Sequence, residues 1–125
     1  ADARAVFEAA ADPTAIRRAA DDLEKRLVAF EEQLFQMKLT GTGQDGVRWP
    51  TMLLERLMHL ASGLESGDFR PTDQQLEVHR LFTERVAAHR KTWGELTTRE
   101  LGAFNALLRE RGLGAIVVPK RTTTE

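Results

Sequence analysis

The sequence predicts an all-α protein: an antiparallel up-down helical bundle of four main helices, with a short leading helix and an extended C-terminal tail. Apolar residues recur at helical spacing through several long segments, and helix-capping residues precede them. No segment outside the tail has the pattern of a β-strand, and the short connections favour antiparallel neighbours. We expect one domain over residues 1–114 and an extended, partly disordered tail over residues 115–125.

The strongest helical pattern runs from Pro13 to about Leu39. Asp12 suits the N-cap, and Pro13 suits the first helical position because its missing N–H costs nothing there. The apolar residues are spaced alternately four and three apart, which is the heptad seam of a helix that packs along its length. Gly41 follows as the residue that ends this helix. The seam consists of Ile16, Ala20, Leu23, Leu27, Phe30, Leu34 and Met37.

Two further helices are expected after a loop. Residues 51–66 carry two adjacent apolar stripes, so this helix should pack against two neighbours. The first stripe is Leu53, Leu57, Leu60 and Leu64, and the second is Leu54, Met58 and Ala61. Residues 67–71 form a break, after which Thr72 and Gln75 make a capping box. The box predicts a helix that continues to about residue 96.

The last helix is predicted from a further capping box, formed by Thr97 and Glu100, and it ends at Gly112. The following residues 115–119 are apolar and favour an extended conformation, whereas residues 120–125 are expected to be disordered. A short leading helix is expected over residues 1–11, with Val6 and Phe7 as its anchors.

The bulk composition restricts the classes of function. The 125 residues are 42% hydrophobic and 30% charged, which suits a globular domain with a real core. The net charge of −1 argues against a nucleic-acid binder, which usually has a basic face. No apolar run approaches the roughly 18–20 residues that cross a bilayer. The absence of cysteine excludes disulfides, thiolate zinc sites and thiol nucleophiles.

The glycines from Gly41 to Gly46 match the spacing G-x-G-x-x-G of dinucleotide-binding loops. That motif works where a strand ends and a helix begins, because helix N–H groups then face the pyrophosphate. Here a helix precedes the glycines, and residues 47–50 separate them from the next helix. We therefore interpret the segment as a helix stop followed by a flexible loop, and we predict no cofactor.

The three histidines are the candidate metal or haem ligands of a helical core. His89 lies near the middle of the inner face of the helix over residues 72–96, and His79 lies at the edge of that face. His59 maps to the polar side of its own helix. Di-iron bundles use Glu-x-x-His, and none of these histidines follows a glutamate at that spacing. We interpret His89 as structural and predict no metal, with His89 or His79 as the candidate ligands of the alternative.

No catalytic constellation is apparent, so we expect no enzyme. The acidic residues map to outer helix faces, where charged residues usually interact with water. The sequence contains neither a Gly-x-Ser-x-Gly elbow nor a His-Glu-x-x-His motif.

The loops contain two aromatic residues, Trp49 and Phe69, each beside an arginine and a proline. They either cap the bundle or anchor an interface, since an aromatic residue with an arginine is a common interface chemistry. The apolar tail is the other candidate contact region. The interface candidates are therefore Arg48, Trp49, Phe69, Arg70, Ile116, Val117 and Val118.

Three runs in order carry a family resemblance: Gly-Thr-Gly-Gln-Asp-Gly-Val-Arg-Trp-Pro at 41–50, Ser-Gly-Asp-Phe-Arg-Pro-Thr at 66–72, and Phe-Asn-Ala-Leu-Leu-Arg-Glu-Arg-Gly-Leu at 104–113. With Gln75 and Trp93, this order resembles the C-terminal helical region of bacterial secreted proteins built on Asp-box (BNR) repeats, often labelled sortilin-like or glycosyl hydrolase. The similarity runs from about residue 20 to residue 113.

The resemblance implies that a β-propeller precedes the helical segment and that any hydrolase chemistry belongs to the propeller. This chain lacks Asp-box turns, so no catalytic residue carries over. The resemblance also implies a periplasmic or secreted location. Because the chain begins at Ala1 with neither Met nor a signal peptide, we expect a longer precursor, or a tag, upstream.

Two functions from different classes follow. The first is a non-catalytic interaction module that packs against a β-propeller of the same precursor or against another protein subunit. The alternative is a helical bundle that binds a small ligand, a metal or haem through a core histidine.

Overall fold

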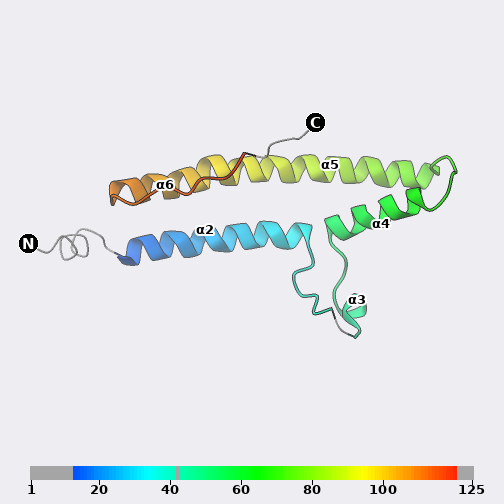
Figure 1. The fold of residues 1–125 in the computed structure, drawn as a ribbon, viewed down its shortest axis with the longest axis horizontal. Coiled ribbons are helices and arrows are strands. Elements are labelled where there is room, and N and C mark those ends of the chain that lie inside the picture. The colour runs from blue at the N-terminus through cyan, green and yellow to red at the C-terminus, as the bar shows by residue number, and fades with distance from the viewer. Residues whose placement is uncertain (1–12, 42, 121–125) are drawn as a thin grey trace, which may run out of the picture. The chain divides into compact units, whose positions relative to one another are not determined.

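The structure, a computed structural model, describes residues 13–41 and 43–120. Every regular element in these two ranges is helical, so the protein is all-α, as predicted (Figure 1). The predicted leading helix over residues 1–11 lies outside the described residues, and so do residues 121–125 of the tail. The elements are α2 (Pro13–Leu34), α3 (Asp45–Arg48), α4 (Leu53–Glu65), α5 (Asp73–Glu95), η1 (Leu96–Glu100) and α6 (Leu101–Glu110). The up-down antiparallel arrangement of the main helices stays a prediction.

Contacts along the chain define two compact units whose boundaries fall inside α2 and α5. The first unit comprises residues 1–26 and 93–125, and the second comprises residues 27–92. Each unit has its own buried apolar side chains among the described residues. They are Leu96, Phe104 and Leu108 in the first unit, and Leu53 and Phe82 in the second.

Helix α2 ends at Leu34, so the prediction that it continues to about Leu39 was wrong. Its last backbone bond joins the Phe35 N–H to the Glu31 carbonyl at 2.9 Å. The next N–H, that of Gln36, donates instead to the Glu55 carboxylate at 2.9 Å. A side-chain acceptor from α4 thus replaces the helical carbonyl, and the heptad pattern does not decide where the helix ends.

The segment after α2 contains a set of hydrogen bonds centred on Asp45. The Asp45 carboxylate accepts hydrogen bonds from the backbone N–H groups of Thr40 and Gly41, each at 2.8 Å, and from the Thr40 hydroxyl. Asp45 also begins the single helical turn α3, which the sequence did not predict. Gly41, with φ +77°, lies in the segment between α2 and α3, so it does not end α2 as predicted.

The capping box at the start of α5 is confirmed. The Thr72 N–H donates to Gln75 Oε1 at 2.9 Å, and the Gln75 N–H donates to Thr72 Oγ1 at 3.2 Å. Two N–H groups that the helix start leaves without helical partners are thereby satisfied.

The second predicted box, Thr97 with Glu100, is wrong. Residues 96–100 continue the helix as a π-helical turn, and the Thr97 hydroxyl donates backwards to the Trp93 carbonyl at 2.9 Å. In a π turn the N–H groups reach five residues back, so helix carbonyls are displaced from their usual partners. Hydroxyl groups can satisfy such carbonyls, and Thr98 bonds the Gly94 carbonyl in the same way at 2.6 Å. Glu100 pairs with Arg26 of α2 instead of capping a helix.

The end of α6 matches the prediction for Gly112. Gly112 has φ +70°, its N–H donates to the Arg109 carbonyl at 3.0 Å, and the Leu113 N–H donates to the Leu108 carbonyl at 2.9 Å. This pair of bonds is a Schellman motif, in which glycine adopts the left-handed conformation without a Cβ clash.

The tail after α6 is extended and held by one side chain. The Asn105 amide donates to the Ile116 carbonyl at 2.8 Å and accepts from the Ile116 N–H at 2.8 Å. Residues 113–120 contain neither helix nor strand. Asn105 thus satisfies both backbone groups of Ile116, as a neighbouring strand would.

Candidate functional site

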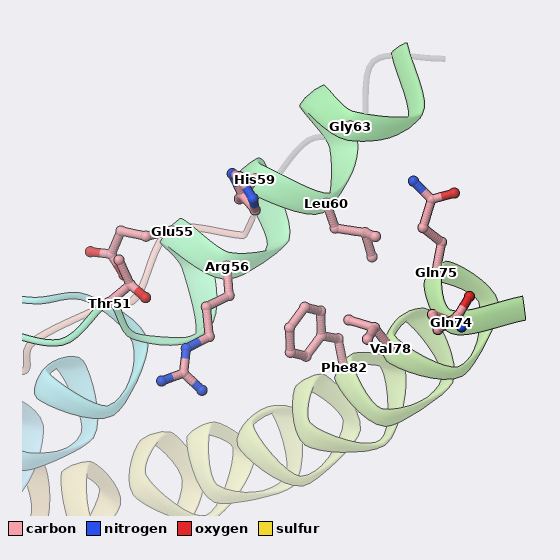
Figure 2. A pocket seen from close by; sticks show the side chains of 10 residues that line it. All are labelled: Thr51, Glu55, Arg56, His59, Leu60, Gly63, Gln74, Gln75, Val78 and Phe82. Carbon is pink, nitrogen blue, oxygen red and sulfur yellow. The ribbon is translucent and has the colours of Figure 1, made fainter. Parts of the chain in front are cut away.

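The second unit contains an open groove between α4 and the first half of α5 (Figure 2). Its volume is about 700 Å³, within the range of roughly 300–1,000 Å³ typical of binding sites. The lining residues from α4 and the segment that precedes it are Thr51, Glu55, Arg56, His59, Leu60 and Gly63, and those from α5 are Gln74, Gln75, Val78 and Phe82.

The floor of this groove is apolar. Leu60 of α4 points toward Val78 and Phe82 of α5 (Figure 2). Val78 and Phe82 are four residues apart, so they lie on the same face of α5, and Phe82 is 9% exposed. Gly63 lies at the far end, where an added Cβ would be 3.7 Å from the Gln75 side-chain nitrogen. A small residue there keeps that end of the groove wide.

The rim of the groove holds two neighbouring charges of opposite sign. Both oxygens of Glu55 accept backbone hydrogen bonds, one from Gln36 and one from Met52, each at 2.9 Å. The bond from Gln36 contributes most to lowering the pKa of Glu55 below its ordinary value, because it favours the charged form of the carboxylate. Arg56 is exposed and forms no ion pair with any residue in the described ranges. The charge that is available to a ligand is therefore the guanidinium.

The structure does not bring the histidines together. His89 is half-buried, and its ring meets the ring of Phe30 edge-on, with centroids 5.8 Å apart and planes at 77°. His79 is exposed, and His59 is exposed on the rim of the groove. Across residues 13–41 and 43–120, no group of three or more His, Cys, Asp or Glu side chains is placed to hold a metal ion.

The two loop aromatics have different environments. Phe69 is 90% exposed, so it does not cap the helices around it, and Arg70 beside it is exposed too. Trp49 is half-buried, and the Lys38 ammonium lies 4.6 Å from the centre of its ring in a cation–π contact. Trp49 precedes α4 and Phe69 follows it, and the 13 residues of α4 span about 20 Å. The two aromatic residues therefore do not form one patch.

The tail candidates are accessible. Val117 is 81% exposed, Ile116 51% and Val118 41%, although the backbone of Ile116 is held by Asn105. Arg48, the remaining interface candidate, is exposed at the end of α3.

Sequence reasoning missed the groove and several exposed apolar side chains. The pattern of two stripes on α4 indicated two neighbours, and the groove lies beside the first stripe, to which Leu60 belongs. The second stripe includes Met58, which is 66% exposed. Val47, 86% exposed in α3, gave no signal at all, because one apolar residue in a loop has no periodicity.

These features define an all-α protein with loosely covered helix faces and an open interhelical groove. Comparison of the chain with the profiles of known protein families, with curated proteins and with solved structures found no match. None of the helices in the described part of the chain is both long enough and apolar enough to cross a membrane.

Proposed function

We propose that this chain is a non-catalytic helical interaction module, which packs its exposed apolar surfaces against another protein. The partner is a β-propeller of the same precursor or a separate subunit in an extracytoplasmic protein. We infer the kind of partner and its compartment from the resemblance to the helical region of Asp-box repeat proteins. We infer the contact surfaces from the exposed apolar side chains of the structure.

The observation that supports this proposal is the distribution of large apolar side chains. Among the described residues five are buried, and the least exposed of them, Leu53, keeps 5% of its surface in water. Fifteen others are at least 36% exposed, with Phe69, Val47 and Val117 above 80%. Single exposed apolar residues are common, whereas a large exposed apolar area marks surfaces that bind a partner.

The candidates differ in how they would contribute. Phe69 with Arg70 has the composition of an interface anchor, because an aromatic ring fills a pocket while the arginine pairs at the rim. The tail offers β-branched side chains on a backbone that Asn105 already orders, so binding through Ile116 and Val117 costs less conformational entropy than binding through a free chain end. Trp49 contributes less surface, since Lys38 already covers one face of its ring.

Site-specific photocrosslinking tests the proposal. A photoreactive amino acid placed at Phe69 or at Val117 should crosslink, in an extract of the source cells, to the same protein, and excess unlabelled chain should compete. Lys91, an exposed α5 residue outside the candidates, is the matched control position. The proposal fails if positions 69 and 117 crosslink no more than position 91, or if competition has no effect.

The intact mass of the native polypeptide then separates the two kinds of partner. A mass far above 14.0 kDa indicates that the propeller belongs to the same chain, whereas an unchanged mass with a crosslinked partner indicates a separate subunit.

A further inference from the structure

A second apolar face of α2 lies outside the heptad seam. Val28 and Phe35 do not belong to the seam, and each is 41% exposed. Glu31 lies three residues after Val28 on α2, and Phe35, the residue directly after α2, still donates its N–H to the Glu31 carbonyl, so the three side chains follow helical spacing. We call this set, Val28, Glu31 and Phe35, the α2 stripe. It presents two apolar groups with a carboxylate between them, and all three residues are exposed.

The groove between α4 and α5 carries the opposite charge beside an apolar surface. Its floor is formed by Leu60, Val78 and Phe82, and its available charge is the guanidinium of Arg56. Glu55 forms no ion pair with that guanidinium, and its two oxygens accept backbone hydrogen bonds instead. In Figure 2 the Arg56 side chain extends beside Phe82, so an incoming carboxylate would meet Arg56 next to the apolar floor.

We propose that the groove of one copy of this chain receives the α2 stripe of a second copy. Val28 and Phe35 would contact the apolar floor, and Glu31 would pair with Arg56. This proposal goes beyond the proposed function, which concerns a different protein. The stripe and the groove belong to the same unit of one chain, and both are exposed, so a second copy can supply the stripe that the groove of the first receives. A helix is a suitable occupant, since two helices that flank an open groove pack readily against a third.

Two copies can make this contact twice, because each copy offers one stripe and one groove. A closed two-fold pair is the commonest arrangement of identical subunits, and it repeats every contact between the two partners. A substitution at a single position therefore alters two contacts in the dimer, so its effect on the dissociation constant is doubled in free energy.

Sedimentation velocity of the full chain, up to about 1 mM, measures the association. We expect reversible self-association of the wild-type chain. Glu31→Arg or Arg56→Glu should each weaken it by about tenfold or more, because like charges then face each other across the contact. The double variant Glu31→Arg/Arg56→Glu restores the pairing with the charges exchanged, so its association should return to near the wild-type value.

Matched controls carry the same charge changes outside the contact. Glu65→Arg alters an exposed acidic residue at the end of α4 that does not line the groove, and Arg90→Glu alters an exposed arginine of α5. Both should associate like the wild type. Gly63→Ala adds a methyl group at the end of the groove and favours the helix, so it should raise the melting temperature while weakening association. Loss of association therefore cannot be attributed to unfolding.

A chain that is monomeric throughout this range overturns the proposal, and so does self-association that Glu31→Arg and Arg56→Glu leave unchanged. Failure of the double variant to recover also overturns it, provided that circular dichroism shows the wild-type helix content. Crosslinking from Phe69 and Val117 to a different protein decides the interaction function separately, so each idea can fail without the other.

Discussion

The carboxylate of Glu55 accepts a hydrogen bond from the backbone N–H of Gln36, 19 residues earlier, at 2.9 Å. Its second oxygen accepts from the N–H of Met52, at the start of its own helix. One side chain thus ends helix α2 and begins helix α4. It links two segments of the second unit through backbone N–H groups that donate to this carboxylate rather than to a helical carbonyl.

Replacing Glu55 should destabilise the protein in a pH-dependent way. Glu55→Ala should cost about 1–2 kcal/mol near neutral pH, because two N–H groups lose a charged acceptor. The folded pKa of Glu55 lies below its ordinary value of 4.5, mainly because of the Gln36 bond. Its stabilisation is therefore complete above that value and is lost as pH falls through the lowered folded pKa.

Urea denaturation between pH 3 and 7 measures this effect. The wild type should lose stability in acid more steeply than Glu55→Gln, which does not titrate. Glu65→Gln, an exposed change at the other end of α4, serves as the control. Parallel pH profiles for the wild type and Glu55→Gln would contradict the assigned role.

Thr72 should matter more than a threonine inside the same helix. Thr72→Ala removes the hydroxyl that accepts from the Gln75 N–H, and it should cost about 1 kcal/mol. Thr83→Ala removes a hydroxyl that only bonds back to the His79 carbonyl, an interaction that does not stabilise helices, so we expect little change or a small gain. Equal urea midpoints for the two variants would show that the capping box contributes nothing.

Asn105 should control the order of the tail rather than global stability. Asn105→Ala removes both hydrogen bonds to Ile116, so hydrogen exchange of the Ile116 amide should accelerate by about tenfold or more. Asn105→Asp keeps an acceptor for the Ile116 N–H but loses the donor to its carbonyl, and it should give an intermediate rate. Unchanged exchange in both variants would mean that other contacts hold the tail.

His89 should tolerate an apolar replacement. Its ring packs edge-on against Phe30, so His89→Leu keeps an apolar contact and should change stability by less than about 1 kcal/mol in either direction. Metal analysis and an absorption spectrum of the native protein accompany this measurement. Bound metal or haem that the variant loses would instead support the ligand-binding alternative.

The features that were predicted correctly depend on neighbours in the sequence. The Thr72–Gln75 box and the Gly112 stop each depend on residues within one helical turn, so short-range geometry suffices to recognise them. The all-α class depends on periodicity repeated over many turns, which makes it robust to errors at single positions.

The wrong predictions share a different cause. Thr97 and Glu100 have the spacing of a capping box, yet Glu100 pairs with Arg26, 74 residues away. The heptad seam continues past Leu34, yet Gln36 leaves the helix to bond Glu55. In both cases a glutamate interacts with a residue far away in the sequence. Local sequence patterns carry no information about such distant partners.

The candidate site likewise combines features that depend on nearby residues with features that depend on distant ones. The sequence by itself determined that the protein is helical, where the cap of α5 and the end of α6 lie, and that α4 has two apolar stripes. Only the tertiary structure decided that α2 stops at Leu34, that residues 96–100 form a π turn, and that Arg56 borders an open apolar groove. Helix formation depends on backbone bonds a few residues apart, whereas a groove and its available charge depend on which side chains from distant segments are already paired.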